Sequence, residues 1–332
     1  MNIKTSDLRK FKDLASHVRR QKNLDIDSFV RFGEGVIAKN AYESVIKFNC
    51  ADSDEPFLIH EEDLYPLIAG TSSEVISIVE TKKGVIVSDG RDKFPALTTE
   101  FQQFLSMPNI PEKTIPIDGD FLTALEKCWP ICAVDENQGQ AFYAYVHIGN
   151  ETMCAGDGAV GFMHPIAQSF KLAIKKEVAS IVSKYEFESF SESDAFYFFH
   201  APDFVMGFRK TVIAYMDIRF AFECKTDRTF TYSAADLKSF NTLFIKRSKT
   251  PVCTFVKGGL EAYDIYLSDK VQKRDAHQIT VPEEFSFNPE KTNRIIDSMG
   301  VETLDFHRGK DMYYIKSVDT NSISLIARVA KL

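Results

Sequence analysis

Two local patterns in this chain contain residue types that support chemistry elsewhere. Gly156-Asp157-Gly158-Ala159-Val160-Gly161 matches the GxGxxG pattern of dinucleotide sites. Such a site needs a helix directly after the pattern, so that the helix N-terminus meets the pyrophosphate. Here Phe162-Met163-His164-Pro165 follows, and a proline at that place opposes a helix. The segment is therefore interpreted as a hairpin with Asp157-Gly158 at its turn.

The second pattern places His60 before Glu61, Glu62 and Asp63, which would suit a metal ion. No second histidine stands at ligand spacing, and acidic residues are favoured in the first turn of a helix by its dipole. The other histidines are scattered without an HxH or HExxH pair, and no Ser or Cys has a nucleophile-elbow context. The sequence predicts no catalytic residue, no metal and no cofactor.

Composition indicates a water-soluble globular protein. The 332 residues are 44% hydrophobic and 26% charged, which is ordinary for soluble domains. No apolar run reaches the 18 residues needed to span a membrane, and residues 1–22 lack the apolar core of a signal peptide. The six cysteines include no CxxC pair, so we expect reduced thiols and a cytoplasmic location.

Charge is distributed unevenly along the chain. The formal net charge is −7, yet residues 6–22 carry +4, residues 165–185 carry +3 and residues 233–249 carry +3, which leaves −17 elsewhere. Cations gathered on a few helical segments predict an electrostatic face for a polyanion. The plain alternative is that exposed helix faces are often rich in lysine.

Landmarks recur along the chain with one period. Phe57-Leu58-Ile59-His60, Phe170 to Ile174 and Phe285 to Asn288 each open a segment that continues into a short helix, and they lie 113 and 115 residues apart. Asp7, Asp120 and Asp236 begin a second series with spacings of 113 and 116. Two unrelated landmarks with one period predict three copies of one domain, at residues 1–112, 113–223 and 224–332.

Each copy is predicted to run helix, strands, helix, strands. The expected helices cover residues 8–18 with Ser6 as N-cap, and then 60–69, 120–128, 175–185, 234–248 and 289–299. Strand-like runs include residues 28–37 and 212–222. The predicted fold class is α+β, with two helices packed on one face of an antiparallel sheet in each copy.

Three stretches resemble the bacterial DNA polymerase sliding clamp, the β-type processivity clamp. Asp63 to Phe94 is similar to its first-domain helix and hairpin, Met153 to Gly158 to its "ATDGHR" segment, and Ile326 to Leu332 to its apolar tail, commonly "VMPMRL". The chain departs from that pattern: Ala159-Val160 replaces His-Arg, and the tail lacks the usual methionines and proline. These departures would suit a divergent or phage-encoded clamp. The resemblance therefore implies the cytoplasm of a bacterial or phage-infected bacterial cell.

The resemblance implies three tandem copies of the DNA-clamp fold and a ring formed by a head-to-tail homodimer. Such a ring encircles double-stranded DNA without reading bases and tethers the replicative polymerase, and it is not an enzyme. Lysines and arginines on the inner helices would attract phosphates. The candidate DNA-facing residues are Arg9, Lys12, Arg19, Arg20, Lys127, Lys175, Lys176, Lys184, Lys238, Lys246, Arg247, Lys291 and Arg294.

The resemblance also implies an apolar cleft that takes short peptides of a DNA polymerase and a clamp loader. Its candidate residues are Tyr143, Gly156, Gly158, Val160, Ile326, Val329 and Leu332, although Ile326 and Val329 equally suit plain strand core. The expected subunit junction pairs Phe94 and Ala96 with Phe244 and Ile245. Two alternatives stay open: a monomeric DNA-binding processivity or scaffold protein of this fold, and an enzyme whose site the sequence does not display.

Overall fold

The structure is a computed structural model, and it describes residues 1–18, 28–50, 56–81, 84–98, 106–133, 141–168, 170–211, 213, 215–264, 267–275, 281, 283–317 and 319–329. Across these residues, one order of ten elements occurs three times in succession: strand, helix, four strands, helix, three strands. No helix in the described ranges is long and apolar enough to cross a membrane.

The elements have the following bounds. The first copy contains β1 (Asn2–Lys4), α1 (Thr5–Ala15), β2 (Phe29–Gly33), β3 (Val36–Asn40), β4 (Ser44–Asn49), β5 (Phe57–His60), α2 (Glu61–Gly70), β6 (Val75–Thr81), β7 (Gly84–Ser88) and β8 (Lys93–Ala96). The second contains β9 (Ile115–Pro116), α3 (Gly119–Cys128), β10 (Tyr145–Gly149), β11 (Thr152–Gly156), β12 (Val160–Pro165), β13 (Leu172–Lys175), α4 (Lys176–Val182), β14 (Ser189–Glu192), β15 (Phe196–His200) and β16 (Phe204–Arg209). The third contains β17 (Arg228–Ser233), α5 (Ala234–Ile245), β18 (Pro251–Val256), β19 (Gly259–Asp264), β20 (Leu267–Asp275), β21 (Phe285–Phe287), α6 (Pro289–Met299), β22 (Thr303–Arg308), β23 (Met312–Lys316) and β24 (Ile323–Ala327).

The chain forms two compact units, which do not coincide with the three predicted copies. Unit 1 comprises residues 1–118 and 186–210, and unit 2 comprises residues 119–185 and 211–332. The second copy is therefore divided: β9 and β14–β16 belong to unit 1, while its helices and β10–β13 belong to unit 2.

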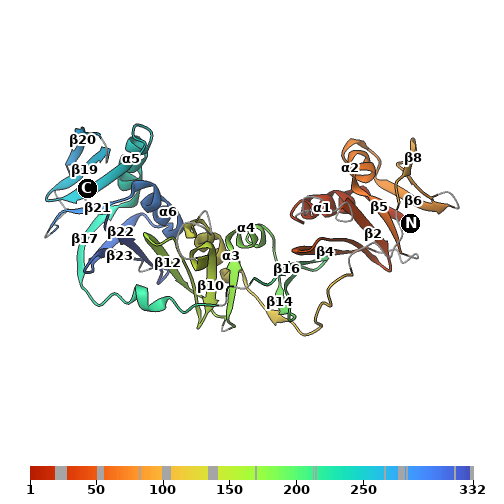
Figure 1. Cartoon of the computed structure of the whole chain (residues 1–332), viewed down its shortest axis with the longest axis horizontal. Coiled ribbons are helices and arrows are strands. Elements are labelled where there is room, and N and C mark those ends of the chain that lie inside the picture. Colours follow the sequence, from red (N-terminus) through yellow and green to blue (C-terminus); the bar gives the residue numbers. More distant parts are fainter. Residues whose placement is uncertain are drawn as a thin grey trace. The chain divides into compact units, whose positions relative to one another are not determined.

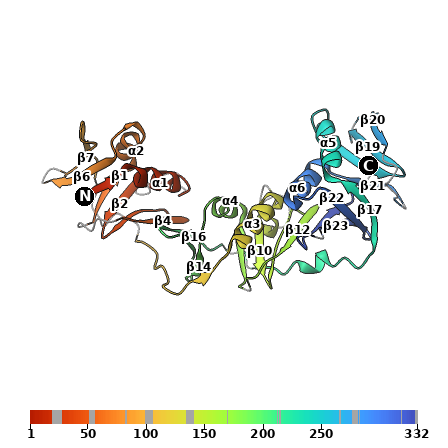
Figure 2. The same cartoon turned by 180° about the vertical axis from the view of Figure 1, so that it is seen from behind.

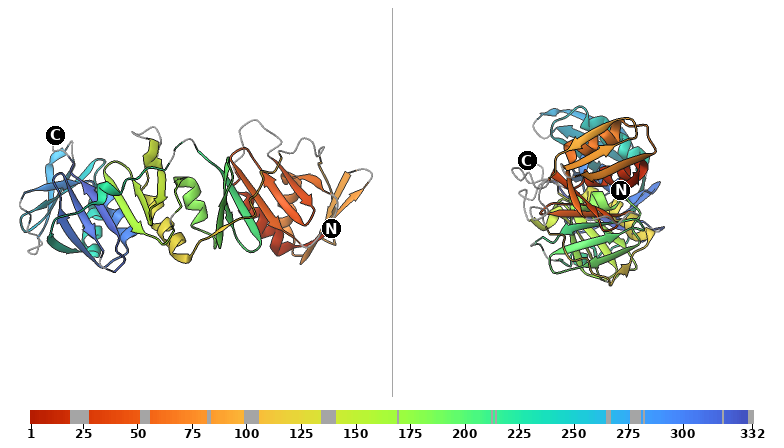
Figure 3. Two further views of the ribbon diagram at one scale, coloured as in Figure 1. Left: turned by 90° about the horizontal axis from the view of Figure 1, so that it is seen from below. Right: turned by 90° about the vertical axis from the view of Figure 1, so that its right-hand side faces the viewer.

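Unit 1 is built on two antiparallel sheets and two helices. One sheet has the order β5-β2-β3-β4-β16-β15-β14-β9 and the other β1-β6-β7-β8; Figure 3 shows the green strands of the second copy beside the orange-red strands of the first. The sheet crosses from copy to copy at the β4–β16 pair, where Val45 faces Gly207. Helix α1 forms because Leu8, Phe11 and Leu14 recur at helical spacing, and all three are buried.

Unit 2 repeats this plan. Its larger sheet has the order β13-β10-β11-β12-β24-β23-β22-β17, and its smaller sheet β20-β19-β18-β21. Here the copies join at the β12–β24 pair. The helices form a row in which α5 packs on α6, α6 on α3 and α3 on α4, and Figures 1 and 2 show α6, α3 and α4 on one side of the larger sheet. An aromatic cluster that includes Phe255, Phe306 and Tyr313 fills the core of the third copy.

Several predicted element bounds were wrong for local reasons. Residues 28–37 form a hairpin, because Gly33, Glu34 and Gly35 take positive φ angles of 124°, 54° and 75°. The N-cap of α1 is Lys4 rather than Ser6. Helix α4 ends at Val182 and α5 at Ile245, each earlier than expected, while α6 has the predicted bounds.

The predicted strand over 212–222 is also wrong where the structure describes it. Residues 213 and 215–218 are irregular, and Arg219–Phe222 form a short 3-10 helix. This segment links the second copy to the third.

Candidate nucleic-acid and peptide interfaces

The candidate DNA-facing residues of unit 1 lie on and after α1. The guanidinium of Arg9 donates to the carbonyl oxygens of Ile68 at 3.3 Å and Thr71 at 2.7 Å, so it caps the carboxyl end of α2. Lys12 is half-buried and its side chain makes no ion pair within the described residues. Arg19 and Arg20 lie outside the described residues.

In the third copy, the cation at the corresponding position of the first helix also joins two helices. Lys238 occupies the position on α5 that Arg9 occupies on α1, and its ammonium pairs with Asp297 on α6. Both cations therefore join the two helices of their own copy. Each side chain remains partly exposed to solvent, so a phosphate that contacts it shares the cation with its partner in the protein.

Three further candidates in unit 2 are engaged by the protein. Lys291 and Arg294 on α6 both reach the carboxylate of Asp157, at 3.1 and 2.9 Å. Lys176 donates to the carbonyl oxygen of Cys132 at 2.9 Å, and burial lowers its pKa. The side chains of Lys291 and Arg294 are 29% and 30% exposed, so solvent still reaches both cations.

The remaining cations are less committed. The side chains of Lys127, Lys184, Lys246 and Arg247 make no ion pair with any residue that the structure describes; Lys175 is half-buried and has a partner. Lys184 follows the end of α4, and Lys246 and Arg247 follow the end of α5. Cations at helix carboxyl ends are also favoured by the dipole alone, so position by itself does not assign them to DNA.

The GxGxxG segment is the hairpin between β11 and β12, as predicted. Its turn depends on Asp157, whose Oδ1 accepts from the amides of Ala159 and Val160, both at 3.0 Å. Gly158 has a φ of +87°, a conformation that side chains with a Cβ rarely adopt. The ring of Tyr143 covers this turn: a Cβ on Gly158 would lie 3.3 Å from Tyr143 Cε2.

The other predicted cleft residues are placed differently from one another. Gly156 lies on β11 with Tyr143 Cδ1 at 3.9 Å from where its Cβ would be. Val160 and Ile326 are only 2% and 1% exposed and face each other across β12–β24, so their burial fits strand core rather than an open cleft wall. Val329 is half-buried and its amide donates to Ser286. Leu332 lies outside the described residues.

Sequence reasoning missed Phe222, which belongs to the linker between the second and third copies. A Cβ on Gly161 would lie 3.0 Å from Phe222 Cζ and 3.2 Å from Leu325 Cγ, so the ring packs into the space that this glycine leaves. Phe222 is 3% exposed, whereas its neighbour Phe220 is 72% exposed. Beside them lies a pocket of about 590 Å³ that Met163 and Arg219 also line. Only the wrong strand prediction for 212–222 hid this aromatic pair.

The predicted junction residues divide in the same way. Phe94 on β8 is 45% exposed and Ala96 half-buried, so both can meet a second chain. Phe244 is 5% exposed and packs inside its own unit, which does not fit a junction role; Ile245 is half-buried. The exposed apolar residue at the end of α5 is Leu243, at 44%.

A pocket of about 470 Å³ lies between α2 and β8. Pro66, Leu67, Phe94 and Pro95 supply its apolar lining, and Glu62, Asp63, Asp89 and Asp92 supply acidic groups. The carboxylate of Asp63 is partly engaged, since it accepts from the amide of Leu97 at 2.6 Å. His60 caps α2, with its Nδ1 accepting from the Glu62 amide at 3.3 Å.

Four of the six cysteine thiols are buried, namely those of Cys128, Cys132, Cys154 and Cys253, whereas Cys50 and Cys224 are half-buried. Burial raises the pKa of the Cys132 and Cys154 thiols to about 12, so neither is a thiolate at neutral pH. His147 accepts from the Met216 amide through Nδ1 and therefore donates through Nε2 to the Phe142 carbonyl. No group of three or more His, Cys, Asp or Glu side chains in the described ranges is arranged to hold a metal ion.

Ten elements follow one order in each of three copies, and the sheets continue from copy to copy. This arrangement is the fold of the DNA sliding clamps. Solved structures with this fold include the DNA polymerase sliding clamp of Caulobacter crescentus, with a TM-score of 0.84, 14% identity and 99% of each chain covered. A putative DNA polymerase III β subunit from Eubacterium rectale matches with a TM-score of 0.83 and 14% identity, over 99% of this chain and 98% of that one. The Helicobacter pylori β clamp, solved with a DNA ligase peptide bound, matches with a TM-score of 0.82 and 12% identity, over 99% and 100%.

No protein-family model and no curated protein matches this chain by sequence. The predicted α+β class and the likeness to bacterial β clamps are thus confirmed at the level of the fold.

Proposed function

We propose that this protein is a DNA polymerase processivity factor, a sliding clamp that surrounds duplex DNA and tethers a polymerase without catalysing a reaction. The observation that carries the proposal is the repeated ten-element order, matched along 99% of the chain by bacterial β clamps. The buried thiols and engaged histidines of the described residues supply nothing that favours an enzyme.

The repeat itself supports closure with a second copy. β4, β12 and β20 are the same element of successive copies, and β8, β16 and β24 are another. β4 pairs with β16 and β12 pairs with β24, while β20 and β8 each end a described sheet. An unpaired sheet edge is a template for another strand. The strand pair that would complete this series is therefore β20 of one chain with β8 of a second chain.

Side chains beside these two edges are complementary. Leu243 projects at the end of α5 with Lys246 and Arg247 next to it, and the pocket beside β8 offers Leu67 and Phe94 with acidic groups around them. A second chain can place its Leu243 against these apolar side chains. Burying the exposed parts of Leu243 and Phe94 contributes roughly 1 kcal/mol each.

A change that introduces a negative charge tests this junction. Leu243→Asp puts a carboxylate into an acidic apolar pocket and should convert the homodimer to a monomer in native mass spectrometry. Phe220→Asp is the matched control, because Phe220 is even more exposed and belongs to the short 3-10 helix Arg219–Phe222 rather than to α5 or β8. A Leu243→Asp protein that stays dimeric at low micromolar concentration would refute this junction.

We propose that the cations of the helix row contact phosphates of the encircled duplex through charge alone. Lys127, Lys184, Lys246 and Arg247 are the best candidates, since their side chains have no ion pair among described residues. The acidic remainder of the chain would repel DNA from other surfaces. Non-specific phosphate contacts permit sliding, because no base contact fixes the position.

The test is topological. The protein, loaded on nicked circular duplex DNA with a compatible clamp loader, should stay bound through gel filtration and should leave after the circle is cut by a restriction enzyme. Equal retention on circular and linear DNA would point to the alternative, a DNA-binding protein that does not close a ring. Absence of retention on either would refute the DNA function.

The proposed polymerase and clamp-loader peptides dock on unit 2, beside Tyr143 and the hairpin 156–160. The Helicobacter pylori clamp holds a DNA ligase peptide, which supports peptide docking as the mode. In this chain Phe222 already occupies the space over Gly161, so a peptide must displace that ring or lie beside it on Phe220. Phe220→Ala should weaken a polymerase-derived peptide in fluorescence anisotropy, whereas Tyr42→Ala, another exposed aromatic residue in unit 1, should not.

A further inference from the structure

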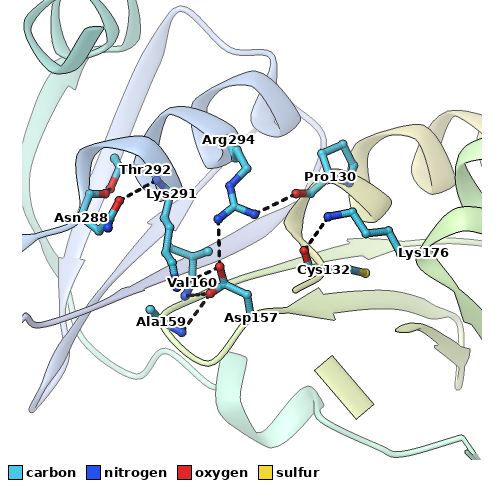
Figure 4. Close-up of polar contacts among 10 residues, drawn as sticks. All are labelled: Pro130, Cys132, Asp157, Ala159, Val160, Lys176, Asn288, Lys291, Thr292 and Arg294. Atoms are coloured by element: carbon cyan, nitrogen blue, oxygen red, sulfur yellow. Dashed lines mark hydrogen bonds and ion pairs between the residues drawn. The ribbon is translucent and has the colours of Figure 1, made fainter. Parts of the chain in front are cut away.

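The Asp157 carboxylate is nearly buried and joins the hairpin between β11 and β12 to helix α6 (Figure 4). Its side chain is 5% exposed. One oxygen, Oδ1, fixes the hairpin turn through the amides of Ala159 and Val160. The other, Oδ2, is shared by Lys291 and Arg294 of α6. The same guanidinium donates through Nη1 to the Pro130 carbonyl at 3.2 Å, beyond the carboxyl end of α3.

The charges in this cluster do not cancel. Lys176, Lys291 and Arg294 supply three cations, while Asp157 and Glu177 supply two carboxylates. Burial lowers the pKa of Lys176, and the nearby Glu177 carboxylate acts in the opposite direction. Lys291 and Arg294 each direct one donor group at the same oxygen. One carboxylate oxygen shared by two cations satisfies neither fully, and both cations are about 30% exposed. A phosphate can therefore bind them from the solvent side.

We propose that Asp157 is an internal competitor of DNA phosphate for Lys291 and Arg294, and that this competition couples DNA contact at α6 to the hairpin 156–160. The inference rests on the proposed function, because the competing polyanion is the encircled duplex and the hairpin borders the proposed peptide cleft. A phosphate that draws the two cations away leaves Asp157 attached only to its own turn. The hairpin, and with it the surface under Tyr143, loses its connection to α6.

The coupling is reciprocal by linkage, since whatever strengthens the Asp157 ion pairs must weaken phosphate binding by the same factor. A peptide that packs on the hairpin in its present position should therefore lower the affinity of α6 for phosphate. Release of the polymerase peptide and tighter contact with DNA would accompany each other. Asp157 acts here as a positioning residue, because it touches neither DNA nor the polymerase.

Asp157→Asn isolates the ion pairs from the turn. An asparagine keeps an oxygen that accepts from the Ala159 and Val160 amides but loses the charge that holds the cations. The matched control is Asp297→Asn on α6, the helix that carries Lys291 and Arg294; it changes the net charge equally and releases Lys238 instead. Trp129, the chain's only tryptophan, directly precedes Pro130, so its fluorescence reports on this cluster without a label.

The experiment titrates a short linear duplex into each full-length protein and records Trp129 emission, hydrogen exchange of the Ala159 and Val160 amides, and affinity as a function of salt. When DNA binds to the wild-type protein, the Trp129 emission should change and the Ala159 and Val160 amides should exchange faster. Asp157→Asn should already resemble the DNA-bound state, should respond no further, and should bind DNA about threefold or more tightly with a salt slope steeper by about 1 to 2. Asp297→Asn should keep the wild-type response.

The outcomes separate this inference from the proposed function. If Asp157→Asn keeps the full wild-type response, or Asp297→Asn abolishes it equally, the competition is refuted while a DNA-binding clamp stands. If the wild-type protein binds no duplex, the titration is repeated with inorganic pyrophosphate. A Trp129 response in wild type that is lost in Asp157→Asn would support the ion-pair network without the DNA function. No Trp129 response in wild type would overturn the network as well. Should Asp157→Asn fail to fold by circular dichroism, Arg294→Gln tests the same point, with loss of the DNA-induced change at the hairpin expected and its persistence contradictory.

Discussion

Gly207 is the position where the junction between the first and second copies has least room. It lies on β16 opposite Val45 of β4. A Cβ placed on Gly207 would come within 2.5 Å of Val45 Cγ1 and 2.7 Å of Phe198 Cε1. Both neighbours are buried, at 2% and 0% exposure, and they belong to one packed cluster that the linker residues Met107 and Ile110 cover. Neither ring nor methyl group can move aside into solvent.

Gly207→Ala should therefore destabilise unit 1 by overpacking, at a cost of about 1 to 3 kcal/mol. For a cooperative unit of this size the midpoint falls by roughly 2 to 4 °C per kcal/mol, so differential scanning calorimetry should show a midpoint lower by about 2 to 12 °C. Removing Cγ1 with Val45→Ala relieves one of the two overlaps. The double variant should then cost less than the sum of the single variants, by about 0.5 kcal/mol or more.

Gly70→Ala is the matched control, because a Cβ there meets nothing within 4 Å and the residue ends α2 in the same unit. It should leave the midpoint unchanged or raise it slightly. If Gly207→Ala unfolds at the wild-type temperature, or if its cost adds to that of Val45→Ala without interaction, the close β4–β16 packing would be wrong.

Three further predictions concern buried charge, pH and surface charge. Glu61→Gln should cost about 3 to 5 kcal/mol in urea unfolding, because it removes the carboxylate charge that pairs with the buried Lys39 ammonium. Replacing Lys39 by Met and Glu61 by Leu should recover most of that loss, and an unchanged single variant would contradict the burial of this pair. Burial lowers the pKa of His147 below its ordinary 6.5. At a pH below about 6.5 the unfolded chain therefore binds a proton more readily than the folded chain, and the free energy of unfolding should fall as the pH drops. His147→Gln should flatten this slope, which His164 and His200 share for the same reason, and an equally steep slope would show that His147 is not involved. Lys246→Glu with Arg247→Glu should reduce the salt slope of duplex binding by about 2, whereas Lys310→Glu, away from the helix row, should reduce it little; equal effects would argue against the helix row.

Periodic landmarks, and residues that begin or end helices and turns, determined how much of the fold was predictable. The recurring landmarks gave three copies and the α+β class, and Pro289 with Asn288 before it predicted α6 correctly, since the asparagine side chain caps the helix through the Lys291 amide. The GxGxxG segment was recognisable as a hairpin because Pro165 excludes a helix. Failures came where an apolar run hid a turn: residues 28–37 look continuous until Gly33-Glu34-Gly35 is taken as a turn.

The candidate site was harder to predict, because a sequence shows a charge but not its partner. Arg9 and Lys238 look like free surface cations, yet each joins the two helices of its copy. Lys291 and Arg294 are three residues apart on α6, but Asp157 lies well over a hundred residues away in the chain. Long-range pairing across β12–β24 creates that contact, and no local pattern encodes it. The division of the second copy between two units has the same origin.

The central claim is that the β20 edge left over by the repeat pairs with β8 of a second chain. Native mass spectrometry over a range of micromolar concentrations tests it directly. We expect a single species at twice the 37.6 kDa of one chain, which Leu243→Asp converts to one chain. A wild-type protein that stays at 37.6 kDa under those conditions would contradict the claim.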